Sequence, residues 1–460
     1  LAEHGFPVYE GMHNTLTSSF QKFTELYPTT GEVYLPNGRV PNVGEVFRNP
    51  EFASALKTMC HAEEEARHKG RVAGIEAARD AFYKGEIAER IVRFISDNPV
   101  EDASGIAHSG LLSYEDFAEW HATVEDPVTY NYRGFDVHKC PTWTQGPVFL
   151  QHLAILDGFD LKKLGHNSAE YLHTWVESVK LAFADREAYY GDPLFDDVPM
   201  DVLLSEEYNS ARRELIGATG SLEMRPGDVG NGVPHYATVD VAEDNRRALG
   251  VATRLAKEQD LTGVHEGDTT HLDAVDREGN MVASTPSGGW LGSSPVIPGL
   301  GFPIGTRGQM FYLNPERPNA LEPRKRPRAT LTPSMVTRQG EPFMAFGTPG
   351  GDSQDQLTLQ FFLNYVEFGM NIQEALDAPA VRSVHFPSSF YPRAAFPGRL
   401  ITEPMIAGEV IAELSRRGHE IEMTDAWYGG KVLAIHYDKS TGVISGGASP
   451  RGTIGYAFGW

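Results

Sequence analysis

The chain has 460 residues, of which 41% are hydrophobic and 10% aromatic, a composition typical of globular proteins with a large core and not of disordered chains. Its 40 Lys and Arg residues are outnumbered by 62 Asp and Glu residues, so the net charge is −22. This acidity argues against nucleic acid or an anionic membrane as a partner, and no apolar run reaches the length of a membrane-spanning helix.

The two cysteines, Cys60 and Cys140, are far apart and lack a metal-ligand spacing. We predict buried thiols in a reducing, cytoplasmic compartment, and the alternative is one disulfide between them.

Residues 1–50 are predicted to be loop-rich with mixed apolar segments, and helices follow. Pro50 opens one, and a second helical region runs from Ile75 to Ile95 with an interruption near Gly85. Three consecutive glutamates at positions 63–65 predict a solvated helix face and not a metal site.

A Pro- and Gly-rich loop at 141–147 precedes an apolar segment, and Ser168 is a predicted cap of a long helix. On that helix, Glu177 and the Asp185-Arg186 pair predict structural ion pairs and not catalytic carboxylates. Residues 217–268 surround one predicted helix at 244–257 and are expected to be exposed and partly mobile.

The following segments predict a hairpin and then a strand that leads into helices. Residues 271–276 alternate, 277–280 form a turn signal, and 281–285 can return as the second strand. Further on, the predicted elements are a strand at 342–346, a helix capped by Asp352 or Ser353, a helix with a capping box of Asn371 and Glu374, a helix at 405–416 and a hairpin at 432–445.

Thr269, directly before the predicted hairpin, is a candidate nucleophile. If the Asp268–Thr269 peptide bond is cut, Thr269 becomes a chain terminus, and its α-amine, with a pKa near about 8, can act as the base for its own hydroxyl. The local alternative is that Thr-Thr-His merely begins a β-strand, because threonine favours strands.

Several segments carry a family resemblance along most of the chain: Gly85-Glu86-Ile87-Ala88, Tyr132-Arg133-Gly134, Ala182 to Arg186, Thr269-Thr270-His271 with Val275-Asp276 and Gly279-Asn280, Arg324 to Arg328, Thr332-Pro333-Ser334, Gly347 to Gly351, Phe368 to Asn371, and Glu374 to Pro379. In this order they resemble the large and then the small subunit of the γ-glutamyltransferase family.

This resemblance implies an α+β fold, the four-layer αββα sandwich of the amino-terminal nucleophile (Ntn) hydrolases. Residues 1–268 would form a large-subunit segment without the family's amino-terminal Gly-Gly-Asn-Ala part, and residues 269–460 the small-subunit segment, together one αββα domain. The two segments of one precursor would pair with each other, and whether such pairs form a dimer stays open. The resemblance implies no metal and no cofactor.

Gly350 and Gly351 precede a predicted helix, where backbone N–H groups suit an oxyanion. An ordinary turn and a phosphate loop are the alternatives, although the Gly-Lys-Ser/Thr sequel of a phosphate loop is missing. The resemblance implies that the two glycines form the oxyanion hole. It also aligns Ser287 with a threonine whose hydroxyl contacts the nucleophile, while the local alternative is a plain loop serine.

The predicted substrate pocket departs from the family pattern. Gln309 is kept, but Gly289 replaces the usual asparagine, Tyr312 replaces the acid that binds the substrate α-amine, and Ala329 and Thr330 replace paired serines. A phenol cannot replace a carboxylate as counter-ion for an ammonium group. Arg324, together with Arg326 and Arg328, is a candidate for binding an anionic acyl group, and solvated surface positions are the alternative.

The sequence therefore predicts an autocatalytically processed amidohydrolase or acyltransferase that cleaves a small-molecule amide through a threonine acyl-enzyme, with an altered acyl pocket. One alternative is a hydrolase of another small acid amide, as in the oxamate-amidohydrolase or cephalosporin-acylase relatives. Another is a non-catalytic family member that acts as a binding protein.

Overall fold

The computed structural model describes residues 1–102, 105–238, 269–391, 393–452 and 455–459. Asp268 and the predicted helix at 244–257 lie outside these ranges. The chain forms two compact units. The first unit consists of Leu1–Val124 and Gly288–Thr306, and the second consists of Glu125–Ser287 and Arg307–Trp460. The predicted division into residues 1–268 and 269–460 is set by the proposed cleavage site and not by packing, and it stays a prediction.

The first unit is mainly helical. Helix α3 (Pro50–Ala66) begins at the predicted proline, and α4 (Arg71–Tyr83) and α5 (Glu86–Asp97) are separated near Gly85, as predicted. A side chain at Gly85 would come within 2.6 Å of the Ala81 carbonyl oxygen, which explains the glycine. Shorter elements complete the unit: α1 (Glu10–Ser18), α2 (Pro28–Tyr34), α6 (Tyr114–Ala118), α13 (Trp290–Ser293), β1 (Phe6–Pro7), β2 (Val46–Phe47), β3 (Val100–Glu101) and β4 (Ala107–His108).

The prediction of buried thiols is wrong for Cys60. This residue lies on the solvent side of α3 and is exposed, whereas Cys140 is partly buried, and both are free thiols. Glu64 and Glu65 of α3 are also exposed, as predicted for a solvated face.

The second unit is built on an antiparallel six-stranded sheet with the order β15-β14-β10-β9-β6-β5. Its strands are β5 (Val128–Tyr132), β6 (Phe135–Lys139), β9 (Ser334–Arg338), β10 (Glu341–Gly347), β14 (Leu433–Asp438) and β15 (Val443–Ala448). The pair β14–β15 is the predicted carboxy-terminal hairpin. Strands β6 and β9, which are neighbours in the sheet, come from opposite sides of position 269 in the sequence.

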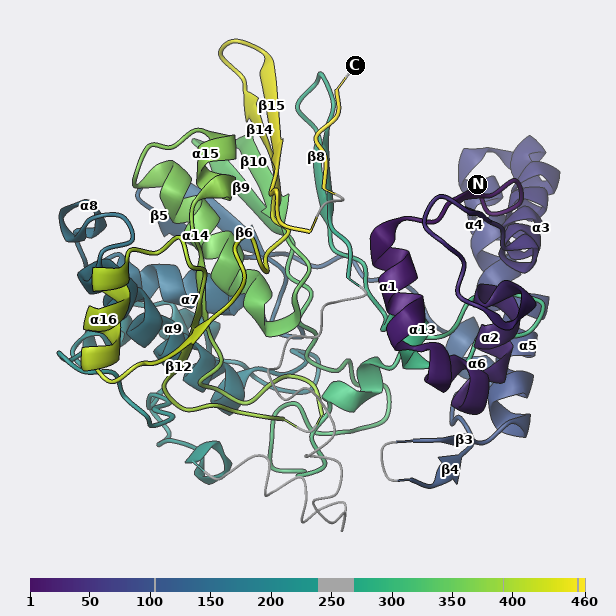
Figure 1. The fold of residues 1–460 in the computed structure, drawn as a ribbon, viewed down its shortest axis with the longest axis horizontal. Helices are drawn as coiled ribbons and strands as arrows, with labels where there is room; N and C mark the ends of the chain where they lie inside the picture. Colours follow the sequence, from purple (N-terminus) through teal and green to yellow (C-terminus); the bar gives the residue numbers. More distant parts are fainter. Residues whose placement is uncertain (103–104, 239–268, 392, 453–454, 460) are drawn as a thin grey trace. The chain divides into compact units, whose positions relative to one another are not determined.

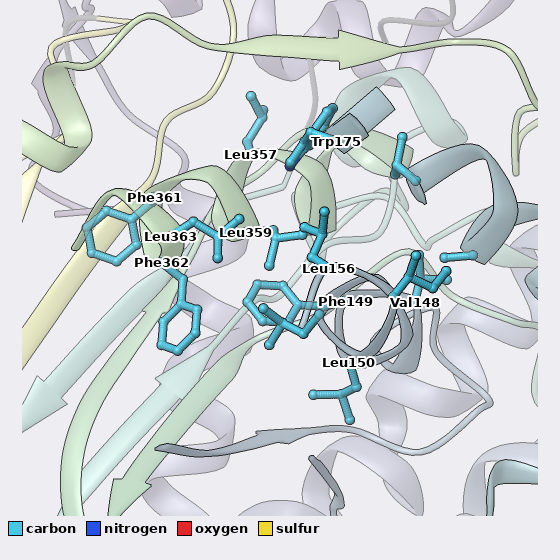
Figure 2. Packing of buried hydrophobic residues seen from close by; sticks show 14 of the residues in the cluster. Val148, Phe149, Leu150, Leu156, Trp175, Leu357, Leu359, Phe361, Phe362 and Leu363 are labelled. Carbon is cyan, nitrogen blue, oxygen red and sulfur yellow. The ribbon is translucent and has the colours of Figure 1, made fainter. Parts of the chain in front are cut away.

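Helices α7 (Pro147–Leu156) and α14 (Gln354–Val366) pack on this sheet and on each other, and α9 (Ala169–Tyr189) packs against α7. Figure 2 shows their apolar side chains together, with Phe149 of α7 near Phe362 of α14 and ring centroids 6.0 Å apart. Ser168 caps α9 by accepting a hydrogen bond from the Tyr171 N–H at 3.1 Å, as predicted.

A separate hairpin of β7 (Leu272–Val275) and β8 (Met281–Ser284), also predicted, packs against β10 and β14, so the sheet lies between this hairpin and the helices (Figure 1). Successive residues of a strand point to opposite faces. Phe346 of β10 accordingly packs against Phe361 of α14, while the next residue, Gly347, lies against His271 beside the hairpin.

The other elements of the second unit are α8 (Leu161–Leu164), α10 (Met200–Leu203), α11 (Glu206–Arg213), α15 (Ile372–Asp377), α16 (Gly408–Arg416), β11 (Val381–Ser383), β12 (Arg399–Thr402) and β13 (Glu420–Met423). The capping box of Asn371 and Glu374 is present at α15. The predicted side-chain cap of α14 is wrong, because Ser353 caps nothing and the Asp352 carboxylate is held by Arg186 and Ser389. Within the described ranges, no helix is long and apolar enough to cross a membrane.

Candidate active site

Thr269 lies at the open end of the β7–β8 hairpin. The Thr270 N–H donates to the Pro286 carbonyl at 3.1 Å, which continues the hairpin pairing up to the residue after Thr269. The Thr269 hydroxyl donates to the Ser287 hydroxyl, with 2.9 Å between the two oxygens, and both side chains are half-buried. The structure thus brings together the candidate nucleophile and the serine that the resemblance assigns to it.

His271 fixes the start of this hairpin. Its ring is buried, with Nδ1 2.8 Å from the Thr285 hydroxyl oxygen and Nε2 2.9 Å from Oδ1 of Asp273. Burial raises the pKa of the Asp273 carboxyl, and the hydrogen bond from His271 opposes that rise. A Cβ atom on Gly347 would lie 2.3 Å from the His271 ring, so only glycine fits there.

The loop after Gly347 carries the two oxyanion candidates. Gly350 has φ 131° and Gly351 has φ 54°, values that L side chains rarely adopt. Within the described part of the chain, neither of their backbone N–H groups donates a hydrogen bond. Two N–H groups that donate no hydrogen bond and that precede helix α14 are suited to binding an oxyanion.

A buried polar network holds this loop. The Gln145 amide donates to the Gly351 carbonyl at 3.2 Å, and the Gln145 carbonyl oxygen accepts from Arg186 at 2.9 Å. Arg186, which is fully buried, also donates to Asp352. The Asp352 carboxylate accepts from both the N–H and the hydroxyl of Ser389, at 2.8 and 2.6 Å.

One residue of the site was missed by the sequence reasoning. The Arg307 guanidinium donates to the Ser287 hydroxyl, and it also lies over the Phe390 ring, 5.7 Å from its centroid. Phe390 in turn lies against Gly351, where a Cβ atom would come within 3.0 Å of the ring. The contacts therefore run from Thr269 through Ser287, Arg307 and Phe390 to Gly351. A single arginine in a glycine-rich loop gives no periodic signal that could have revealed this.

The predicted substrate-binding residues are more dispersed. Tyr312 is fully buried and donates to Glu187, with the Arg393 and Arg317 guanidinium groups 4.4 and 4.6 Å from its ring centroid. Burial raises the pKa of the Glu187 carboxyl, but Arg328 and Arg186 outweigh this effect and hold it at about 2. The Tyr312 hydroxyl is therefore bonded to an interior carboxylate that is charged at neutral pH.

Thr330 is buried after Ala329, whose backbone bonds to Trp143 and Gln145 at 2.8 and 2.9 Å. Gln309 is exposed, and its carbonyl accepts from Arg393 at 3.1 Å. Gly289, with φ 93°, belongs to the first compact unit.

Of the three arginines considered for an anionic acyl group, Arg324 is exposed and has φ 64°. The other two form ion pairs within the protein, Arg326 with Asp192 at 2.7 Å and Arg328 with Glu187 at 2.6 Å.

The charges of α9 are structural, as predicted. Glu177 pairs with Lys180 at 2.6 Å and with Arg225 at 3.0 Å, and Asp185 pairs with Arg212 at 3.5 Å. In the described ranges, no three His, Cys, Asp or Glu side chains are grouped as metal ligands.

The site thus combines a hydroxyl pair, a cation beside it and a loop with two N–H groups that donate no hydrogen bond within the described residues. This combination suits acyl transfer, in which a hydroxyl attacks a carbonyl and the developing negative charge needs donors.

Comparison with known proteins gives the family. Residues 1–459 match the gamma-glutamyltranspeptidase family. The glutathione hydrolase-like YwrD proenzyme of Bacillus subtilis (strain 168) is 28% identical over 455 residues, covering 98% of this chain and 73% of the relative. The acylase ACY 1 proenzyme of Pseudomonas sp. (strain SE83) is 26% identical over 454 residues, covering 98% and 68%.

Solved structures agree. The structure of LmbA2991HD has a TM-score of 0.89 and 45% identity, covering all of this chain and 76% of that one. The cephalosporin acylase from Bacillus halodurans has a TM-score of 0.77 and 28% identity, covering 98% and 71%. The predicted αββα fold of the Ntn hydrolases is confirmed by these likenesses. The chain belongs to the gamma-glutamyltranspeptidase family and is an enzyme of the Ntn-hydrolase type.

Proposed function

We propose that this enzyme cuts its own chain before Thr269 and then uses the new terminus to cleave an amide. The Thr269 hydroxyl oxygen attacks the Asp268 carbonyl carbon, the peptide C–N bond breaks, and the proton passes from oxygen to nitrogen. The resulting ester is hydrolysed by water, which leaves a carboxylate on residue 268 and a free α-amine on Thr269.

The same hydroxyl then attacks the substrate amide. The α-amine of Thr269 takes the hydroxyl proton and returns it to the leaving amine, while the Gly350 and Gly351 N–H groups hold the oxyanion. The acyl group on Thr269 is released to water, or to an amine acceptor in a transferase. The observation that carries this proposal is the 2.9 Å contact of Thr269 with Ser287, on a hairpin packed at the start of the glycine loop.

The acyl pocket favours a substrate other than a γ-glutamyl amide. The residue at the position of the family acid, Tyr312, is a phenol bonded to Glu187 in the interior, and it supplies no negative charge for a substrate ammonium group. Hydrolysis of another small acid amide is therefore our preferred form of the proposal.

Intact mass and amino-terminal sequencing of the purified protein test the processing. We expect two chains, the second of which begins at Thr269, and a Thr269→Ala variant that stays as one chain. A Thr269→Ala protein that still splits at this bond would refute the mechanism. For specificity, we expect glutaryl-p-nitroanilide to be turned over faster than γ-glutamyl-p-nitroanilide, and the opposite order would show that the pocket argument is wrong.

A further inference from the structure

The carbonyl group of Gly351 is held by a side chain from a distant part of the sequence. The Gln145 amide donates to this carbonyl at 3.2 Å, and the same oxygen accepts from the Gln354 N–H at the start of α14. Gln145 precedes α7 and lies before the proposed cut, whereas Gly351 lies after it. The proposed acyl transfer gives Gln145 no role, although its side chain is fully buried beside the loop of the two glycines.

Two glycines do not fix the direction of their own N–H groups. Glycine lacks a Cβ atom and has more backbone freedom than other residues, and Gly350 and Gly351 both have positive φ values. The peptide group between them is held because the Gly350 carbonyl accepts from the Ser353 N–H at 3.0 Å. The Gly351 carbonyl belongs to the next peptide group, and its bond to Gln145 limits rotation about Gly351 from the other side. The direction of the Gly351 N–H is therefore defined by both bonds.

Gln145 is itself held in place. Its side-chain oxygen accepts from Arg186 at 2.9 Å. Its backbone N–H donates to the Ala329 carbonyl at 2.9 Å, and its carbonyl accepts from the Val148 N–H at 2.9 Å. Both the backbone and the amide of this residue are thus fixed by hydrogen bonds. A residue held in this way can keep the loop in place while charge develops, as preorganised donors require.

We propose that Gln145 is a positioning residue, which acts through the loop to direct the Gly350 and Gly351 N–H groups toward the developing oxyanion. This inference rests on the proposed function and deepens it, because the site on the small-subunit segment then depends on a residue of the large-subunit segment. Donors that act only when charge develops lower the barrier of the chemical step and contribute little to substrate binding. Loss of the Gln145 donor should therefore lower kcat and leave KM almost unchanged.

The test replaces Gln145 in two ways. Gln145→Glu keeps the length of the side chain and an oxygen for Arg186, but a second oxygen faces the Gly351 carbonyl in place of the N–H donor. Gln145→Met removes both hydrogen bonds at similar volume. For the processed fraction of each variant, we expect kcat on glutaryl-p-nitroanilide to fall by about 10- to 100-fold, with KM changed by less than about threefold.

Two outcomes of this comparison would overturn the proposal. If Gln145 served only to hold Arg186, the glutamate variant would have the kcat of the wild type while the methionine variant would not. If Gln145 contributed to substrate binding, KM would rise at unchanged kcat.

The matched control is Gln360→Glu, the same change in another buried glutamine. Gln360 lies further along α14, where it donates to the Val381 carbonyl at 2.7 Å and accepts from the Val381 N–H at 2.9 Å. This variant should be less stable in urea unfolding, while kcat of the folded protein stays within about threefold of the wild type. Equal losses of kcat in the Gln145 and Gln360 variants would mean a general effect of a buried charge, and would overturn the proposal.

A second readout does not depend on the acyl pocket. p-Nitrophenyl acetate carries an activated ester: the Thr269 hydroxyl oxygen attacks its carbonyl, p-nitrophenolate leaves, and the α-amine takes the hydroxyl proton. We expect acetylation of the chain that begins at Thr269, followed by mass, to be about 10- to 100-fold slower in Gln145→Glu. A wild type that is not cut before Thr269, or that is cut but not acetylated there, would refute the proposed function. Processed variants with wild-type rates would refute this inference alone.

Discussion

The imidazole of His271 lies directly against the α carbon of Gly347. His271 follows the candidate nucleophile by two residues, and Gly347 begins the loop that leads to Gly350 and Gly351. This contact therefore connects the hairpin that carries the hydroxyl to the loop that carries the proposed oxyanion donors.

A Gly347→Ala substitution should disturb this connection. The added methyl group would meet the His271 ring at 2.3 Å, and such overpacking typically costs about 1–3 kcal/mol. We expect slower cleavage before Thr269 and at least about tenfold lower kcat, since a small displacement of reacting groups has large effects on rate. Time courses of self-cleavage and steady-state rates check this. Gly408→Ala is the control, because nothing lies within 4 Å of the added atom.

Ser287→Ala removes the hydroxyl bonded to Thr269. Loss of a hydrogen bond to a reacting group costs roughly 1.5–3 kcal/mol, so we expect self-cleavage and turnover to slow by about 10- to 100-fold. Ser287→Thr keeps the hydroxyl and should retain activity within about threefold. An alanine variant as fast as the wild type would show that this serine only lines the loop.

Asp352→Asn should destabilise the protein. The carboxylate accepts from Arg186 and from Ser389, and Arg186 is fully buried, so the neutral amide removes one of the two carboxylates paired with this cation, the other being Glu187 at 2.8 Å. Breaking such a pair typically costs about 3–5 kcal/mol, measured here by urea unfolding. The exposed Asp126, changed to Asn, is the matched control and should shift stability by less than about 0.5 kcal/mol.

His385 should make stability dependent on pH. Its Nδ1 accepts from the Gly398 N–H at 3.0 Å, and its Nε2 lies 3.2 Å from the Glu223 carbonyl oxygen, an arrangement that fits the neutral ring. Burial, together with the nearby charge of Lys180, lowers the pKa of His385 to about 4. Below the unfolded pKa of about 6.5, the unfolded chain binds a proton that the folded chain does not.

The contribution of His385 to stability is therefore complete above about pH 7 and is lost as the pH falls toward 4, at about 1.4 kcal/mol per pH unit. Urea unfolding at pH 7, 6 and 5 should show a smaller slope in His385→Gln than in the wild type. Replacing the exposed His68 by Gln should leave the slope unchanged. Equal slopes in all three proteins would show that His385 titrates normally in the folded state.

Features that depend on neighbouring residues could be predicted from the sequence. The caps at Ser168 and Asn371 and the hairpin after Thr269 follow from side chains a few residues apart, and all three are present. The cap at Asp352 failed because Arg186, 166 residues away in the sequence, binds the same carboxylate. A local rule cannot anticipate that competition.

The contacts of the arginine side chains within the protein were not predicted from the sequence either. Arg307 meets Ser287 across 20 residues, and Arg328 meets Glu187 across 141. A buried charged side chain needs an oppositely charged partner, and here that partner is distant in the sequence. Its burial therefore cannot be predicted before the fold is known. The sequence offered Arg324, Arg326 and Arg328 as candidates for binding an anionic acyl group, whereas the guanidinium that contacts Ser287 is that of Arg307.

Strands β6 and β9 form five consecutive residue pairs, from Phe135 with Arg338 to Lys139 with Ser334. A cut before Thr269 would turn this pairing into an association of two separate polypeptides. Melting would then release two molecules in place of one, so the melting temperature of the mature enzyme should rise with its concentration, while that of an uncut Thr269→Ala chain should stay constant.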